Sequence, residues 1–252
     1  MQHLGADRSL KGKLRRRLAR LTARRPAPSG AQKPMVSICF DDAPESAALA
    51  GAEILEARGL KGSYFISMGL AGQDGPMGLN ADAAQIGRLL EAGHEIGCHT
   101  FSHLNCGMAP IGIVEGDVEQ NLQALRRLGA PAPATFAYPY GEVSAPAKAV
   151  VGERFALARA LHHGLIDRGS DLNQAPAVGI EGPDGEAVAR RWLRRTLEER
   201  AWLILFSHDV REDPSPFGCT PGALARLADE AVAGGAEVVT VAEGCQRIGA
   251  LD

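Results

Sequence analysis

The chain has 252 residues, of which 45% are hydrophobic, so it is long and apolar enough for one barrel-sized domain with a substantial core. Its net charge is only −3, and no apolar run approaches the ~18 residues of a membrane-spanning helix. The five cysteines are odd in number and form no CxxC pair, which argues against a disulfide framework and favours a reducing compartment.

The small net charge hides a basic N-terminal arm on an acidic body. Residues 1–33 carry ten Lys or Arg and one acid, about +9, whereas the remainder carries 17 basic and 29 acidic residues. Leucines recur within the arm at spacings of four, four and three, which places them on one helical face: Leu10, Leu14, Leu18 and Leu21. Pro26–Gly30 then indicates a linker. The expected division is therefore an arm over 1–33 and a catalytic domain over 34–252.

The arm has two interpretations. Residues 8–25 fit an amphipathic helix on an anionic membrane surface, where each basic residue contributes roughly 1 kcal/mol. Alternatively, the segment is a solvated tail, or a helix packed on its own domain or on a partner. No nucleic acid is expected, because no aromatic residues accompany the charge. The start of the chain lacks the apolar region and cleavage site of a secretory signal, so we expect a cytoplasmic protein, with the inner face of the inner membrane as the surface for the arm.

From Met35 onward, strand-like and helical patterns alternate, which predicts an α/β fold with a parallel sheet. About seven strands favour a barrel over an open sheet. The predicted strands are 35–40, 63–67, 95–99, 135–138, 155–158, 203–207 and 237–241. The predicted helices are 46–58, 81–92, 114–128, 186–200 and 222–233, and residues 160–185 are expected to be rich in loops.

Ionisable residues follow three of these strands. Asp41 and Asp42 end the first strand, and two adjacent side chains diverge there, so that one can bind a metal while the other stays free as a base. A simple turn before Pro44 is the structural alternative. His99 and His103 are spaced to share one metal, and two imidazoles with one carboxylate are the ligands of a catalytic zinc.

The remaining candidates are less specific. His208 follows the strand Leu203–Ser207 and is a fourth ligand, a general acid or a buried structural residue. His94 is expected to be structural, and His162 and His163 to lie on the surface. The bent, aromatic segment Phe136–Gly141 can direct a backbone N–H at a developing oxyanion, although a plain turn would look the same.

These segments carry a resemblance to a known family. In order, Cys39–Asp42, His99–His103, Phe136–Gly141 and Leu203–Asp209 are similar to the motifs of the polysaccharide deacetylases of the NodB-homology type, carbohydrate esterase family 4. The resemblance spans about residues 35–245 and extends to the branch that acts on exopolysaccharides and holdfast adhesins. It implies a single domain with a distorted, incomplete (β/α)7-type barrel.

The resemblance also implies roles for individual residues: Asp42, His99 and His103 as metal ligands, Asp41 as the general base, His208 as the general acid, and Tyr140 as the donor of an N–H to the oxyanion. Two departures from the family pattern stand out. Ala137 replaces the arginine of the third motif, for which Arg159 could substitute in space. The motif that orients the histidine acid is not clean, and Asp167 and Asp171 are its candidates.

The expected function is a metal-dependent N-deacetylase that acts on N-acetylglucosamine-type residues of a bacterial exopolysaccharide or its lipid-linked precursor. Zinc is the expected metal, and a His₂Asp set also accepts Co²⁺ or Mn²⁺. One alternative is a deformylase of a lipid-linked formamido sugar. Another is a glycan-binding protein that contains a metal without turnover, although such a protein would need neither a spare base nor a spare acid.

Overall fold

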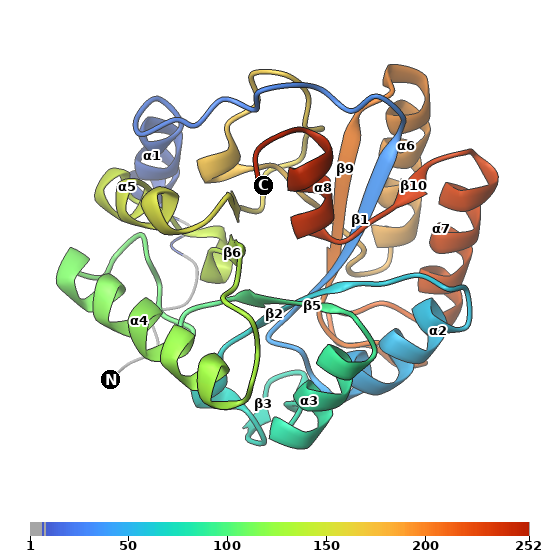
Figure 1. Cartoon of the computed structure of the whole chain (residues 1–252), viewed down its shortest axis with the longest axis horizontal. Coiled ribbons are helices and arrows are strands. Elements are labelled where there is room, and N and C mark those ends of the chain that lie inside the picture. Colours follow the sequence, from blue (N-terminus) through green and yellow to red (C-terminus); the bar gives the residue numbers. More distant parts are fainter. Residues whose placement is uncertain (1–6, 8, 252) are drawn as a thin grey trace.

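The centre of the molecule is a curled sheet of parallel strands (Figure 1). The computed structural model describes residue 7 and residues 9–251; Arg8 and the first six residues of the predicted arm lie outside this part, as does Asp252. Within the described part, eight strands form the sheet in the order β7-β6-β5-β2-β1-β9-β8, with β10 also paired to β1. The strands are β1 (Met35–Asp41), β2 (Ser63–Ile66), β5 (Glu95–Cys98), β6 (Thr135–Ala137), β7 (Leu157–Arg159), β8 (Val178–Gly179), β9 (Trp202–Ser207) and β10 (Glu237–Val238).

The central strands are buried on both faces, which explains their nearly continuous apolar sequences. Every residue of β1 and of β9 is buried, and the two strands pair in parallel from Met35 opposite Trp202 to Phe40 opposite Ser207. The edge strands β7 and β8 do not pair with one another, so the sheet curls without closing. The predicted incomplete (β/α) barrel in a single domain is therefore confirmed.

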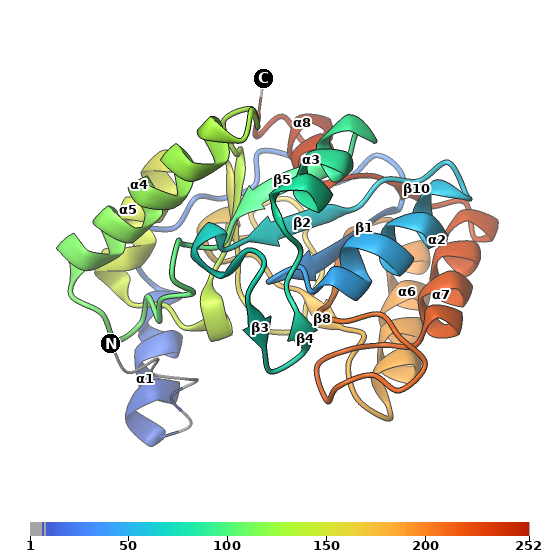
Figure 2. The same ribbon diagram turned by 90° about the horizontal axis from the view of Figure 1, so that it is seen from below.

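The helices lie around the outer side of the sheet, apart from the last one, which contacts β1 and β7 and lies over the middle of the barrel (Figures 1 and 2). They are α1 (Leu10–Ala19), α2 (Ala52–Glu56), α3 (Ala83–Glu91), α4 (Ile111–Arg127), α5 (Ala145–Arg154), α6 (Gly185–Glu199), α7 (Pro221–Ala233) and α8 (Val241–Arg247). A π-helical turn, Ala47–Gly51, precedes α2, so the predicted helix over 46–58 is split. No described helix has the length and apolarity to cross a bilayer.

The sequence patterns missed the shortest and least periodic elements. The helix α5 is rich in alanine and valine without a clear apolar stripe, and α8 has only seven residues. The strand β8 has two residues and lies in the region expected to be loops. A small antiparallel hairpin of β3 (Asp74–Gly75) and β4 (Gly78–Leu79) stands apart from the main sheet.

The N-terminal arm packs on the body along one flank. In α1 the small residues Gly12 and Ala19 are buried, and the helix contacts α5. Glu142, only 1% exposed, binds the guanidinium groups of Arg15 and Arg16. The alternative of a helix packed on its own domain thus describes this flank. The four leucines of the stripe point away from the body and are 52–83% exposed.

Candidate metal centre and active site

All of the candidate residues lie at one edge of the sheet. The strands β1, β5, β6 and β9 are parallel, so their C-terminal ends meet at the same edge. Asp41 is the last residue of β1, His99 directly follows β5, and His208 directly follows β9. Tyr140 lies in the 3₁₀ turn Pro139–Gly141 after β6. The fold therefore brings together residues that are far apart in the chain.

Three of these side chains converge on one point. The Asp42 Oδ1 atom is 3.7 Å from His99 Nε2 and 3.4 Å from His103 Nε2, and the three ligand atoms all lie within 4.8 Å of one another. Asp42 Oδ1 is buried and accepts no hydrogen bond from the described residues. A buried carboxylate oxygen without a donor, facing two imidazole nitrogens, fits a divalent cation with one carboxylate and two histidine ligands.

His99 is oriented for this role by the neighbouring strand. Its Nδ1 lies 2.8 Å from the carbonyl oxygen of Ala137, so Nδ1 carries the proton and donates it, which leaves Nε2 as the ligand atom. Burial lowers the pKa of His99 to about 4. The imidazole is therefore neutral near pH 7, as metal ligation requires.

The loop that carries both histidines is held by a residue that sequence reasoning missed. The Asp117 carboxylate, on α4, accepts hydrogen bonds from the backbone N–H groups of Phe101 and Ser102 and from the Ser102 hydroxyl, at 2.7–3.0 Å. Within the loop, Thr100 and His103 have left-handed φ values of 59° and 55°. Such conformations are uncommon for residues other than glycine and concentrate at functional sites.

Asp41 is paired with an arginine on the opposite side of the barrel interior. Arg159, at the end of β7, is fully buried between the rings of Phe65 and Phe206 and donates from Nη2 to Asp41 Oδ1. Its Cα is the direct partner of Ala137 on β6. The guanidinium missing from the third motif is thus supplied from the adjacent strand at the same level.

The two neighbouring aspartates respond to burial in opposite ways. Burial alone would raise the pKa of Asp41, but Arg159 and the nearby histidines outweigh it and hold the pKa below its usual value. Asp42 has no arginine partner, and burial raises its pKa. Asp41 is therefore a carboxylate near neutral pH without a metal, whereas Asp42 gains most from a bound cation.

His208 is oriented by Glu181, and neither Asp167 nor Asp171 contacts it. Glu181 Oε1, just beyond β8, is 3.0 Å from His208 Nδ1. Burial would lower the pKa of His208, but the bond to Glu181 and the surrounding carboxylates raise it to about 9. Asp171 instead pairs with Lys148, and Asp167 accepts a hydrogen bond from the Arg168 N–H in a turn. The prediction failed because the carboxylate follows a strand of only two residues, which gives no sequence signal.

Tyr140 completes the edge beside the metal ligands. Its φ is 59°, and its ring packs edge-on against His103 with the centroids 4.4 Å apart. Of the other histidines, His94 is buried between Glu56 and the Gly62 N–H, which confirms its structural interpretation. His163 is exposed, but His162 is half-buried and borders a cavity, contrary to the expectation of a surface residue.

Comparisons with known proteins show that the fold is shared with several solved structures. A Mycobacterium smegmatis structure named as a polysaccharide deacetylase is 16% identical, with a TM-score of 0.68, and the match covers 91% of this chain and 96% of that one. The chitin deacetylase of Colletotrichum lindemuthianum is 19% identical, with a TM-score of 0.62 and 85% and 88% coverage. A Clostridium thermocellum family 4 acetyl xylan esterase, solved with cobalt, is 19% identical, with a TM-score of 0.58 and 84% and 90% coverage.

These identities establish a shared fold, and no curated protein matches the chain by sequence. The family model described as polysaccharide deacetylase matches residues 29–153, a range that contains Asp41, Asp42, His99, His103 and Tyr140. The chain therefore carries a polysaccharide deacetylase domain that includes residues 29–153.

Proposed function

We propose that the protein is a metal-dependent N-deacetylase of N-acetylglucosamine-type residues. One observation carries this proposal: the convergence of Asp42 Oδ1, His99 Nε2 and His103 Nε2, all within 4.8 Å. Asp41 with Arg159 and His208 with Glu181 surround this point. A hydrolase needs both a base and an acid beside its metal, and a protein that only binds glycans needs neither.

Each residue has a distinct task. Bound by Asp42, His99 and His103, Zn²⁺ would polarise the acetyl carbonyl and lower the pKa of the attacking water. Asp41, kept ionised by Arg159, accepts the proton of that water. The Tyr140 N–H donates to the developing oxyanion. His208, kept protonated by Glu181, then donates its proton to the departing amine.

The proposed substrate is a bacterial exopolysaccharide or its lipid-linked precursor. The fungal relative is named a chitin deacetylase, and chitin presents the same acetamido sugar. Zinc is the proposed metal, and Co²⁺ or Mn²⁺ would suit the same ligands. We place the enzyme in the cytoplasm, where buried, unpaired thiols such as Cys39 and Cys98 stay reduced.

The helix α1 supports peripheral binding to an anionic membrane. Its leucine stripe (Leu10, Leu14, Leu18 and Leu21) is exposed, and lysines and arginines flank it, as in helices that lie in the plane of a bilayer surface. The buried flank of the helix holds it in a fixed orientation on the body. The inner face of the inner membrane would then present a lipid-linked glycan directly to the site.

The test is acetate release from N-acetylglucosamine oligomers by purified protein, with and without added zinc. Metal-dependent release that falls by about 10²–10⁴-fold in Asp41→Asn would establish the deacetylase and its base. Full activity in Asp41→Asn would refute the assignment of the base. Release of formate from a formamido sugar, with no acetate from any acetamido glycan, would instead favour the deformylase.

A further inference from the structure

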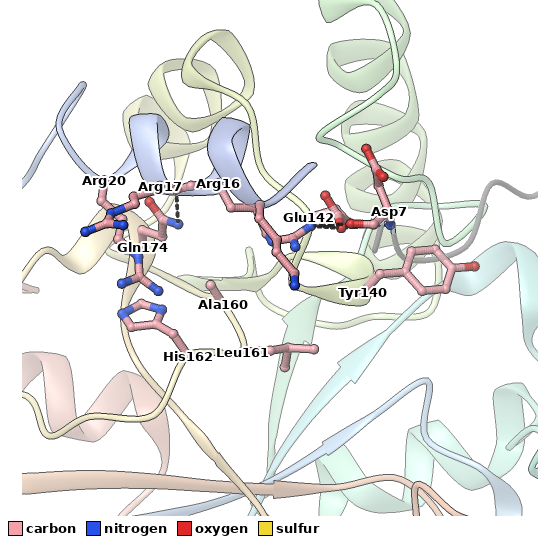
Figure 3. A pocket seen from close by; sticks show the side chains of 12 residues that line it. Asp7, Arg16, Arg17, Arg20, Tyr140, Glu142, Ala160, Leu161, His162 and Gln174 are labelled. Carbon is pink, nitrogen blue, oxygen red and sulfur yellow. Dashed lines mark hydrogen bonds and ion pairs between the residues drawn. The ribbon is translucent and has the colours of Figure 1, made fainter. Parts of the chain in front are cut away.

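A cavity lies beside α1 (Figure 3). Its volume is about 510 Å³, within the usual range for small-molecule sites. Four cationic side chains line one wall, three from α1 and one from its C-cap residue: Lys13, Arg16, Arg17 and Arg20. His162 lies on the side away from α1, Gln174 lies beside Arg17 and donates from Nε2 to the Arg16 carbonyl oxygen, and Tyr140 lies at the far end (Figure 3).

Most of this positive charge has no counter-ion among the residues that the structure describes. The two acids at the border of the cavity, Asp7 and Glu142, are already engaged by Arg15 and Arg16. Across residue 7 and residues 9–251, no carboxylate forms an ion pair with the other three cations: Lys13, Arg17 and Arg20. The cavity therefore attracts an anion with more than one negative charge.

A buried polar atom indicates that the ligand also carries donors. Gln174 is only 3% exposed, lines the cavity, and its Oε1 accepts no hydrogen bond from the described residues. A buried amide oxygen without a donor costs free energy unless a ligand or water supplies one. A sugar hydroxyl provides such a donor within reach of the cationic wall.

The cavity adjoins the reacting centre through one residue. Tyr140 lines the cavity, and its ring lies 4.4 Å from that of the metal ligand His103. Tyr140 is therefore shared between the lining of the cavity and the surroundings of the metal centre. The leucine stripe lies on a different face of the same helix, turned outward from the body.

We propose that this cavity binds the diphosphate of a glycosyl diphosphate, so that the attached acetamido sugar reaches the metal centre. This inference rests on the proposed function and specifies its substrate. A diphosphate diester carries two negative charges spread over several oxygens, which suits Lys13, Arg17 and Arg20 together. A nucleoside diphosphate sugar and a polyprenyl diphosphate sugar share this chemistry, and the exposed leucines favour the second source.

Binding can be measured without turnover, in metal-loaded protein that carries Asp41→Asn. The probes are uridine diphosphate N-acetylglucosamine, a polyprenyl diphosphate N-acetylglucosamine in neutral micelles, and the uncharged N-acetylglucosamine dimer. The test variant is R17E/R20E. Its matched control is R191E/R194E on α6, two exposed arginines with the same spacing and no ion pair within the described part of the chain.

Both diphosphates are expected to bind at least about tenfold more tightly than the dimer, and R17E/R20E should remove this difference while the control keeps it. Equal affinity for charged and uncharged probes, or loss in both double variants alike, would overturn the proposal. Tighter binding of the polyprenyl probe identifies the lipid source, and tighter binding of the uridine probe identifies the soluble one. Since no turnover is measured, failure of the deacetylase assignment would appear separately, as absent acetate release.

Discussion

The charged side chains at the metal edge of the sheet have partners of opposite charge, whereas most of the cations on the α1 side of the molecule do not. At the metal edge, Asp41 is paired with Arg159, and His208 with Glu181. On α1, Arg17 and its two neighbouring cations have no carboxylate partner among the described residues, and the leucine stripe is exposed. A buried charge needs a partner of opposite charge, whereas an exposed charge is solvated and can remain unpaired until a ligand binds. The first region is thus preorganised for chemistry and the second remains open for recognition.

Removal of a metal ligand should lower the catalytic activity most. We expect His99→Ala to lose the bound metal and to lower kcat/KM by at least about 10³-fold, because the metal contributes several kcal/mol to transition-state stabilisation. Metal content measured alongside turnover checks this. His94→Gln is the matched control, since it removes another buried imidazole away from the metal ligands. If His99→Ala retained stoichiometric zinc, the ligand assignment would be wrong.

Substitution of Arg159, which stands on β7 in place of the third-motif arginine, should give the next largest effect. In Arg159→Met, only the nearby histidines still oppose the burial of Asp41, so its pKa should rise and the acid limb of the kcat/KM profile should move to higher pH. The sign follows from the base: activity needs ionised Asp41 and is lost as the pH falls through its pKa. The loss of kcat/KM should be largest on the acid side of the profile and should shrink at higher pH, where Asp41 is ionised again.

A swap of the two positions sharpens this test. Ala137 and Arg159 are paired at the same level of β6 and β7, so Ala137→Arg combined with Arg159→Ala returns the guanidinium to the strand that carries it in the family pattern. The double variant should recover part of the lost activity and lower the acid limb again. An unchanged acid limb in Arg159→Met would show that the ion pair does not set the state of the base.

Glu181 controls the other limb of the profile with a smaller effect. Glu181→Gln removes the carboxylate at His208 Nδ1, so the pKa of His208 should fall from about 9. His208 donates a proton only below its pKa, and the alkaline limb should therefore move down by about one pH unit, with a loss that approaches about tenfold above pH 9. Asp171→Asn, at the residue that pairs with Lys148, should leave this limb in place. A shift in Asp171→Asn and none in Glu181→Gln would reverse the assignment.

The comparison of Asp41, which the sequence identified, with Glu181, which it missed, shows what could be predicted from the sequence. Long apolar strands such as β1 and β9 end in the ionisable residues that the patterns singled out, and the site formed where those strands end. Glu181 and Arg159 follow or end strands of two and three residues, which are too short for a periodic signal. Their partners depend on the order of strands in the sheet. Asp117 acts on the histidine loop from a helix, through backbone N–H groups that no side-chain pattern reveals.

Substitutions in the leucine stripe of α1 should weaken membrane binding without changing turnover. Leu14→Ser with Leu18→Ser should weaken binding to vesicles containing phosphatidylglycerol by at least about tenfold, because both side chains would otherwise enter the bilayer interface. Turnover of soluble oligomers should be unchanged. Point variants are needed, since removal of the whole arm would leave the buried Glu142 carboxylate without Arg15 and Arg16 and destabilise the body.

The control for this experiment comes from the opposite side of the molecule. Leu49 and Val232 are 43% and 52% exposed and lie near α2 and on α7, away from α1 (Figure 1). Leu49→Ser with Val232→Ser should bind vesicles as the unaltered protein does. Equal weakening in both double variants would mean that general surface hydrophobicity, rather than the face of α1, drives adsorption. If neither double variant changed vesicle binding, the leucines of α1 would not bind a membrane. The helix would then act only on the glycan, through the cations that line the cavity beside Tyr140.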